Sequence, residues 1–591
     1  MSANRAGSFA GLVILIGLQM TSGSVSAADN GDSDSYVRGG PFLMFPEHHD
    51  TSVPVSEMAP DAQERQSQGE SALSVPIRRA RPPLVSSEPD SVLQRFASNK
   101  PLVSTTSLTQ FEGLCNRDSE VPPDANAAVG RTQIVETVNS SLGIYTKDGT
   151  PLVVNGLGRV FAYFTGPCDP QDPAYIFGRI WADPVVLYDK QADRWIISYV
   201  AILDPRFFGQ RAQTYYVCQG VSTSSDATGT WNRMSIAYPP QNFNGTDYPV
   251  VPDYPKLGVW PDGYYATYNM FRLNSDGSDT FLGARVCAFN RSVLLNGGTA
   301  PPVCFQRPAS DSSLLPADLD GATPPAAGEP NFLLEIASTS ALNLYRFHVD
   351  FDVPSNSTLS GPFTIPVATF SEACGGSGAC IPQPPVNGTT TYLDSVGDRL
   401  MHRLAYRNFG DHESLVTNHS VAVGGSVGVR WYEIRNPNGT PTVFQQGTYA
   451  PDSNRRWMGS IAMDRSGNIA LGYSVSSGSL FPSIRFTGRA ATDTLGNMQA
   501  ESAIVTGQSS QSGFTCTSDP NCASRWGDYS SMAIDPVDDS TFVYTNEYYP
   551  PPGSGCPVNG GMMTFAPWKT QIAKFGIQAQ AKPTGGKGGH N

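Results

Sequence analysis

The densest group of titratable side chains in the sequence is Asp411-His412-Glu413. A histidine between two carboxylates can move protons near neutral pH, as hydrolysis or lyase chemistry on a uronic sugar requires. Tyr529 adds a hydroxyl from a second polar motif. We therefore take Asp411, His412, Glu413 and Tyr529 as catalytic candidates. The alternatives are that the histidine is structural, or that it binds a metal together with His402 and His419.

Arginines form a second candidate set. The planar guanidinium group binds carboxylates through two parallel hydrogen bonds, so arginines from successive repeats suit an acidic ligand. The alternative is that these arginines pair with aspartates and tie neighbouring sheets together. The predicted ligand-binding residues are Arg403, Arg456, Trp457, Arg525 and Asp528.

Aspartates at the start of successive repeats form a third set. Asp124, Asp183 and Asp253 would converge if the repeats surround an axis, and carboxylate oxygens are the ligands that Ca²⁺ prefers. We predict a structural Ca²⁺ site there and no required cofactor. The alternative is that each aspartate caps a turn or accepts a hydrogen bond from the backbone of a neighbouring sheet.

These side chains belong to a loosely repeated unit, in which a polar opening motif leads into a strand, a tight turn and a second strand. We find seven such motifs, around positions 124, 183, 253, 329, 411, 457 and 528. Turns such as Pro-Asp-Gly and Asp-Arg-Ser-Gly favour reversal between strands. Several strands are apolar on both faces, as strands between stacked sheets must be.

The repeats predict an all-β fold, a seven-bladed β-propeller. Its ring would close by pairing a strand near Ser107–Phe111 with one at Thr570–Ile577. Six blades remain possible if the motif at 329 is an insertion, and two β-sandwich domains are the other alternative.

Composition restricts the partners and the compartment. The formal net charge of −13 disfavours nucleic acid as a partner. Residues 1–27 have the charged start, short apolar core and small residues of a secretory signal peptide. We expect a secreted or periplasmic protein without a membrane span, and a monomer.

The predicted divisions are a signal peptide (1–27), a flexible lead or pro-segment (28–105), the propeller (106–577) and a flexible tail (578–591). Export permits disulfide bonds among the ten cysteines. Spacing favours four pairs, although it does not settle their connectivity: Cys374–Cys380, Cys516–Cys522, Cys287–Cys304 and Cys115–Cys168.

Two features resemble a known group. Residues 224–231 (SSDATGTW) resemble the Asp-box of sialidase-type propellers, with one extra residue before the glycine. Longer motifs, among them PPDANAAVG, YPKLGVWPDGYY and RWGDYSSMAIDP, lie between Pro122 and Tyr549. That region resembles secreted bacterial sialidase-like (BNR-type) β-propellers of uncharacterised activity.

The resemblance implies fold and export and carries no agreed reaction. Sialidases hold a substrate carboxylate with three arginines and use a tyrosine nucleophile activated by a glutamate. Arg403, Arg456 and Arg525 would be the matching arginines, but the chain lacks the Arg-Ile-Pro motif that opens sialidase propellers.

Three functions remain open from the sequence. The favoured one is recognition of an extracellular ligand, a glycan, at the channel face of the propeller. The second is a carbohydrate-active enzyme, a sialidase-like glycoside hydrolase or a uronate lyase. The third is a structural envelope protein. Fold alone does not choose among them.

Overall fold

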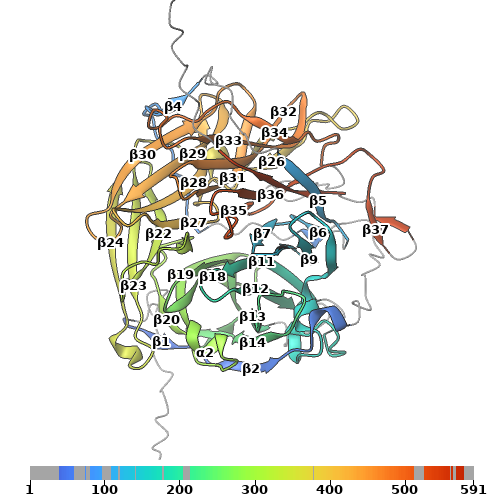
Figure 1. Cartoon of the computed structure of the whole chain (residues 1–591), viewed down its shortest axis with the longest axis vertical. Coiled ribbons are helices and arrows are strands. Elements are labelled where there is room, and N and C mark those ends of the chain that lie inside the picture. The colour runs from blue at the N-terminus through green and yellow to red at the C-terminus, as the bar shows by residue number, and fades with distance from the viewer. Residues whose placement is uncertain are drawn as a thin grey trace, which may run out of the picture.

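The computed structural model of the chain describes residues 39–58, 73–74, 80–95, 108–117, 120–139, 141–175, 179–203, 213–376, 378–511, 525–558, 561–563 and 567–577. The regular secondary structure of the described residues is nearly all β-strand, with one short α-helix, α2 (Arg291–Leu295), and a few short 3-10 helices. The strands form antiparallel sheets arranged side by side (Figure 1). The all-β prediction is therefore confirmed.

Seven groups of four strands follow one another through the described residues, and we number them sheets 1 to 7. Neighbouring strands within each group pair antiparallel. The first three groups are sheet 1, β7 (Asn126–Val129), β8 (Gln133–Val138), β9 (Ser141–Thr146) and β10 (Pro151–Gly156); sheet 2, β11 (Arg179–Asp189), β12 (Arg194–Leu203), β13 (Tyr215–Ser222) and β14 (Trp231–Tyr238); and sheet 3, β17 (Val250–Val259), β18 (Gly263–Leu273), β19 (Asp279–Asn290) and β20 (Val303–Gln306).

The next three groups lie between residues 315 and 505. They are sheet 4, β21 (Leu315–Asp320), β22 (Asn331–Ser338), β23 (Ala341–His348) and β24 (Thr358–Pro366); sheet 5, β27 (Leu404–Asn408), β28 (Glu413–Val423), β29 (Ser426–Arg435) and β30 (Thr442–Tyr449); and sheet 6, β31 (Arg455–Met463), β32 (Ile469–Ser477), β33 (Leu480–Arg489) and β34 (Ser502–Val505). Strands β21 and β27 also pair in parallel, which joins sheets 4 and 5, together with the short strand β4 (Leu93–Gln94), into one nine-stranded sheet.

Sheet 7 combines the two ends of the body. It contains β35 (Ser531–Ile534), β36 (Phe542–Tyr548), β39 (Lys569–Phe575) and the early strand β5 (Thr109–Cys115). Phe111 lies opposite Ile572, and Thr109 lies opposite Lys574. The predicted pairing of an early strand with a late one is confirmed, and the two strands lie side by side in Figure 1.

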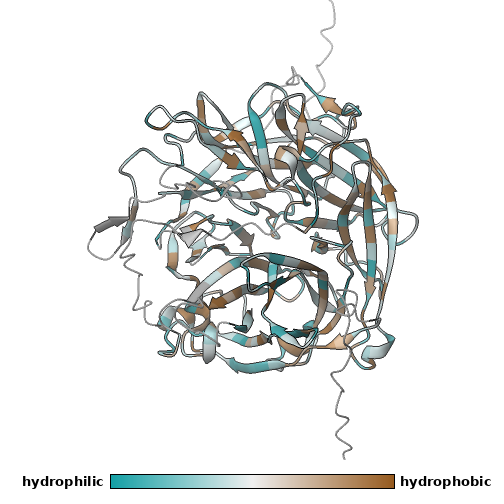
Figure 2. Ribbon diagram, turned by 180° about the vertical axis from the view of Figure 1, so that it is seen from behind, coloured by the Kyte–Doolittle hydropathy of each residue, from teal (hydrophilic) through white to brown (hydrophobic). Residues whose placement is uncertain are grey.

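The first strands of the sheets form a closed cycle. Among the described residues β7 contacts β11, and contacts then continue through β17, β21, β27, β31 and β35 back to β7. Each sheet therefore packs against two neighbours around a common axis. This arrangement explains why residues such as Val185–Leu187 are buried on both faces of their strand. Hydrophobic residues, coloured brown, occur along many of the strands in Figure 2.

Aromatic side chains fill the spaces between sheets. The segment that resembles an Asp-box behaves in this way, because Trp231 is buried in the core shared by sheets 1 and 2. The Asp226 carboxylate accepts hydrogen bonds from the Thr228 N–H (2.9 Å) and from Gln133 Nε2 of sheet 1 (2.8 Å). The segment that resembles an Asp-box therefore has a structural role here.

Five of the seven predicted opening motifs lie at the first strand of a sheet. The motifs at Glu329 and Asp411 do not, because they precede the second strands β22 and β28. Those two predictions were wrong, since an acidic turn also occurs between the first and second strands of a sheet. The first strands β21 and β27 follow Asp311 and Asp398, which the sequence analysis did not select as opening residues.

Four disulfides form among the described cysteines: Cys115–Cys556, Cys168–Cys218, Cys287–Cys304 and Cys374–Cys380. The last two were predicted, whereas the Cys115–Cys168 pairing was wrong. Cys115 lies on the strand that closes the ring, so its partner is 441 residues away. Cys516 and Cys522 lie outside the described residues. Disulfides indicate an oxidising compartment, outside the cytosol.

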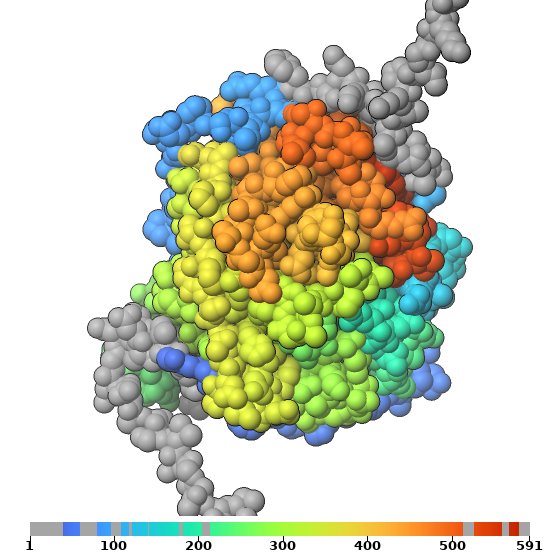
Figure 3. Space-filling view, turned by 60° about the vertical axis from the view of Figure 1, so that its left-hand side comes forward, coloured from blue at the N-terminus to red at the C-terminus, as the bar shows by residue number. Residues whose placement is uncertain are grey.

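The described parts of residues 28–105 lie along the outside of the body, which the prediction of a flexible lead did not anticipate. Strand β1 (Phe42–Leu43) pairs with β20, β2 (Pro46–Thr51) with β14, and β4 (Leu93–Gln94) with β30. Blue residues from this part of the chain lie at the periphery in Figure 3. The signal peptide and the tail fall outside the described residues.

The remaining short strands form two-stranded pairs: β15 (Gln241–Phe243) with β16 (Thr246–Tyr248), β25 (Ala379–Pro382) with β26 (Tyr392–Asp394), β3 (Leu73–Ser74) with β6 (Glu120–Val121), and β37 (Cys556–Val558) with β38 (Gly561–Met563). No helix in the described part of the chain is long and apolar enough to cross a membrane.

Candidate functional site

Bulges mark the start of several first strands. The register shifts between Ala182 and Val185 in β11 and between Asp253 and Lys256 in β17. Within these bulges Asp183 (φ 55°) and Tyr254 (φ 53°) have left-handed backbone conformations, which are strained for non-glycine residues and cluster at functional sites. The bulges set the direction of the side chains at this end of the sheets.

Three carboxylates from three sheets meet there. One oxygen each from Asp124, Asp183 and Asp528 lies within 4.8 Å of the others. The residues are 1%, 5% and 8% exposed, respectively. Asp124 precedes β7, Asp183 lies in β11, and Asp528 precedes β35, so the group bridges neighbouring sheets across the closure of the ring. We call these three residues the aspartate trio.

Part of the trio caps backbone groups of neighbouring sheets, the alternative considered from the sequence. Asp124 accepts hydrogen bonds from the Asp528 N–H (2.7 Å) and from Asn139 Nδ2 (2.9 Å). Asp183 Oδ2 accepts from the Tyr254 N–H of sheet 3 (3.1 Å). The carboxylates therefore help to hold the ring together.

Lys256 is a buried cation beside the trio. Its Nζ lies 3.4 Å from the ring centroid of Tyr254 and 4.0 Å from that of Tyr529, and it donates a hydrogen bond to the Pro255 carbonyl (2.8 Å). A fully buried ammonium group needs such partners, and aromatic faces supply part of the lost hydration. The negative charges of Asp183, Asp528 and Asp124 act on it as well.

Burial and mutual repulsion perturb the acids and the amine in opposite directions. Burial, with the charge of Asp528 next, raises the pKa of Asp124 to about 7. Burial and the charge of Asp253 raise the pKa of Asp183 well above its usual value. Burial lowers the pKa of Lys256 to about 7 against the opposing effect of the trio. Groups of both kinds therefore exchange protons near neutral pH.

His402 completes the buried cluster from sheet 5, immediately before β27. Its ring centroid lies 5.9 Å from that of Tyr529, and the residue is 1% exposed. Burial and the positive charges of Lys256 and Arg403 lower its pKa well below the usual range, so the imidazole is neutral. We call the trio, Lys256, Tyr254, Tyr529 and His402 together the axial cluster.

A small cavity of about 30 Å³ continues along the same first strands. Ala127 and Ser531, which line it, follow Asp124 and Asp528 by three residues, about 10 Å of extended strand. Lys190, Asp318, Asp320 and Arg403 supply its charged groups. Arg403 bonds both aspartates, and Lys190 Nζ lies 2.8 Å from Asp320 Oδ1. We call this space the axial cavity.

The structure separates most of the predicted catalytic residues from the cluster. Asp411, His412 and Glu413 lie at the far end of β27 from His402, about 16 Å along the strand. The Asp411 side chain is 84% exposed and lies 2.7 Å from His412 Nδ1, while Glu413 accepts a hydrogen bond from the Tyr406 hydroxyl (2.6 Å). Of the four candidates, Tyr529 alone belongs to the cluster.

The three arginines do not form one carboxylate-binding pocket. Arg403 pairs with Asp318 and Asp320, Arg456 with Asp452 and Glu501, and Arg525 with Asp394 and Asp528. Each guanidinium already contacts two carboxylates of the chain, in agreement with the alternative that these arginines tie elements together. The arrangement expected from the sialidase resemblance is therefore absent from these residues.

Two other predicted residues have different surroundings. Trp457 is fully buried, with its ring centroid 5.7 Å from that of Trp526, so it contributes to the core. Asp253 is half-buried and raises the pKa of Asp183 by its charge. The set of three close carboxylates, however, contains Asp528 in place of Asp253.

Sequence reasoning missed Lys256 and Tyr254 as site residues, and it considered His402 only as a metal ligand. Tyr254 and Lys256 follow the predicted opening Asp253 closely, so the motif position was a usable signal. His402 had no such signal, because the opening of sheet 5 was placed at Asp411.

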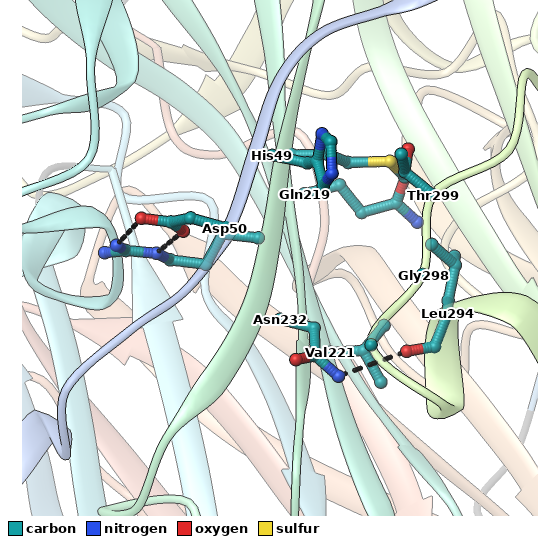
Figure 4. A pocket seen from close by; sticks show the side chains of 11 residues that line it. His49, Asp50, Gln219, Val221, Asn232, Leu294, Gly298 and Thr299 are labelled. Atoms are coloured by element: carbon teal, nitrogen blue, oxygen red, sulfur yellow. Dashed lines mark hydrogen bonds and ion pairs between the residues drawn. The ribbon is translucent and has the colours of Figure 1, made fainter.

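A second hollow, of about 10 Å³, lies between β2, sheet 2 and α2 (Figure 4). Arg233 and Asp50 form an ion pair at one side, and Asn232 Nδ2 donates to the Leu294 carbonyl (3.2 Å). Within the described residues the buried Gln219 amide has no hydrogen-bond partner. This hollow lies where the lead docks, away from the axial cluster.

Comparisons with known proteins identify no family. No protein-family model matches the chain, and no curated protein matches its sequence. Similar solved structures include a protein of unknown function from Dyadobacter fermentans (TM-score 0.30, 14% identity, 68% of this chain and 96% of that chain). The WD40 domain of SCAP from fission yeast has a TM-score of 0.29 and 11% identity, and the match covers 83% of this chain and 97% of that chain. A GH43 β-1,3-galactosidase has a TM-score of 0.26 and 10% identity, and the match covers 59% of this chain and 98% of that chain. Similarity this low carries no argument about function.

Proposed function

We propose that the protein is an exported seven-bladed β-propeller that binds an extracellular glycan at the axial cluster. The observation that carries the proposal is the convergence of Asp124, Asp183, Asp528, Lys256 and His402 from separate sheets. The closed cycle of first strands supports the count of seven. In such a ring the parallel pairing of β21 with β27 is a contact between two neighbouring blades.

The chemistry of the cluster suits sugar hydroxyls. Carboxylates accept hydrogen bonds from hydroxyl groups, and an ammonium group donates to them. The rings of Tyr254 and Tyr529 supply aromatic surface beside these groups. Such a combination of a few fixed polar groups with aromatic walls is typical of small-ligand sites.

A glycan array followed by calorimetry tests the proposal. The wild-type protein should bind at least one glycan, and Asp183→Asn should weaken binding by about tenfold, because it removes the charge that strengthens a hydrogen bond. The control is Glu335→Gln, which changes a buried acid that bonds Tyr345 (2.8 Å) in sheet 4. Absence of binding to every glycan, or equal losses in both variants, would contradict the proposal.

A carbohydrate-active enzyme is the second candidate, and one observation favours it. The trio brings three carboxylates together, and retaining glycosidases act through a pair of carboxyl groups roughly 5–5.5 Å apart. Asp124, with a pKa of about 7, is also suited to act as a general acid. Incubation of the protein with each bound glycan, followed by chromatography of the products, distinguishes turnover from binding.

A structural Ca²⁺ ion at the trio remains a proposal. Three close carboxylates favour a hard cation, but Lys256 already places one positive charge beside them. The cation and the glycan need not exclude each other. Glycan binding measured with and without added Ca²⁺ shows whether the glycan needs the cation.

A further inference from the structure

His402 is a buried polar residue whose hydrogen bonding is incomplete. Within the described residues its Nε2 atom has no hydrogen-bond partner, although the residue is 1% exposed. A buried polar atom without a partner is unfavourable, and such atoms in folded proteins call for an explanation.

Neighbouring polar groups in the axial cluster do have partners. The Tyr529 hydroxyl donates to the Pro184 carbonyl (2.8 Å), and the Tyr254 hydroxyl to the Leu400 carbonyl (3.4 Å). Lys256 donates to the Pro255 carbonyl. The incomplete bonding at His402 is therefore a local feature of that side chain and not a general looseness of the cluster.

We infer that His402 Nε2 contacts a hydroxyl group of the bound ligand at the axial cluster. This inference rests on the proposed function and deepens it by assigning a ligand-contacting residue. The ligand class is a polyhydroxylated molecule, a sugar. A neutral imidazole nitrogen either donates or accepts according to its tautomer, and a hydroxyl can satisfy both states. A carboxylate or phosphate, which only accepts, can satisfy one.

The lining of the axial cavity includes one chain neighbour of His402. Arg403, which lines the cavity, is the residue next to His402 in the chain. Because its guanidinium is held by Asp318, Asp320 and the Met532 carbonyl, Arg403 is fixed in place beside the cavity.

His419 provides a matched control. It is also fully buried, its pKa is also lowered by burial, and its Nδ1 also has no partner in the described residues. Its Nε2, however, lies 2.9 Å from the Tyr432 hydroxyl, and its ring stacks on Tyr432 in sheet 5. Replacement of His419 should thus reproduce any general cost of losing a buried imidazole.

The test uses the full chain and calorimetry with the strongest glycan from the array. His402→Phe keeps a ring against Tyr529 but removes the nitrogen, so affinity should fall by roughly tenfold, the size of one hydrogen bond. His402→Gln, which both donates and accepts, should retain most of the affinity. His419→Phe should bind like the wild type. Wild-type affinity in His402→Phe would overturn the inference and leave the proposed function standing.

A measurement on the wild-type protein guards against a variant that fails to fold. With ¹⁵N-labelled histidine, the seven imidazoles give a small set of signals, and His402 is assigned from His402→Gln. The glycan should shift the His402 Nε2 signal and leave that of His419 in place. An unshifted His402 signal on saturation with the glycan would overturn the inference. If the wild type binds no glycan, the proposed function fails and this inference fails with it.

Discussion

Glu136 offers a direct test of how the ring is closed. The residue lies in β8 of sheet 1 and is fully buried. Its Oε2 accepts a hydrogen bond from the Leu114 N–H (3.0 Å), and its Oε1 from the Thr545 hydroxyl (2.6 Å). Both partners belong to sheet 7. A Cβ on Gly113 would lie 2.3 Å from Oε2, so a larger residue there would require the Glu136 side chain to shift.

Burial raises the pKa of Glu136 from 4.5 to about 7, although its hydrogen bonds oppose the shift. Since the folded state holds the proton more tightly than the unfolded state, protonated Glu136 favours folding below pH 4.5. That contribution is lost as the pH rises from 4.5 to 7 and stays lost above it. A pKa difference of about 2.5 corresponds to roughly 3 kcal/mol of unfolding free energy.

Urea unfolding of Glu136→Gln at pH 5 and pH 8, with disulfides intact, measures this contribution. The wild type should lose about 3 kcal/mol more stability between these pH values than the variant. An exposed control, Glu57→Gln, should follow the wild type. If Glu136→Gln showed the same pH dependence as the wild type, burial of an ionised carboxylate at the closure would be the wrong explanation.

Three further predictions address the closure, the trio and the lead. Cys115→Ser should lower stability by about 2–4 kcal/mol, because the bond to Cys556 restricts the unfolded chain; a melting temperature equal to that of the wild type would contradict this. If the trio binds Ca²⁺, a Ca²⁺ concentration of about a hundred times Kd should raise the unfolding free energy of the wild type by about 2.7 kcal/mol and leave that of Asp528→Asn unchanged. Thermal unfolding with and without a chelator measures the difference. Removal of the residues up to 58 should lower the unfolding free energy by about 3–5 kcal/mol, because Val55 and Met58 are buried in the core of sheets 1 and 2. Denaturant unfolding of the shortened and the full chain measures this loss.

The sequence predicted those parts of the fold that depend on local patterns. Strands apolar on both faces, tight turns and repeated opening motifs indicated an all-β ring, and the pairing of β5 with β39 followed from it. Asp124, Asp183 and Asp528 were all named as residues at the openings of repeats. These three aspartates lie close together because each occupies the same position in its repeat, and repeated positions can be recognised in a sequence.

Other features depend on contacts that no local pattern records. The Cys115–Cys556 bond joins residues 441 apart, so spacing could not indicate it. The arginines were correctly seen as carboxylate binders, but their partners are in the same chain. Asp411 was misplaced because a turn between two strands of a sheet has the same acidic composition as an opening motif.

Structural support and the proposed ligand contacts can use different oxygens of Asp183, but not of Asp124. Asp124 uses both carboxylate oxygens, on the Asp528 N–H and on Asn139. Asp183 uses Oδ2 on the Tyr254 N–H, so an asparagine there can keep that bond while it removes the charge. The same side chain can therefore hold two sheets together through one oxygen and face the axis with the other. This division explains why the capping role observed for the trio does not argue against a binding role: the ring must be closed before its axis can hold a ligand.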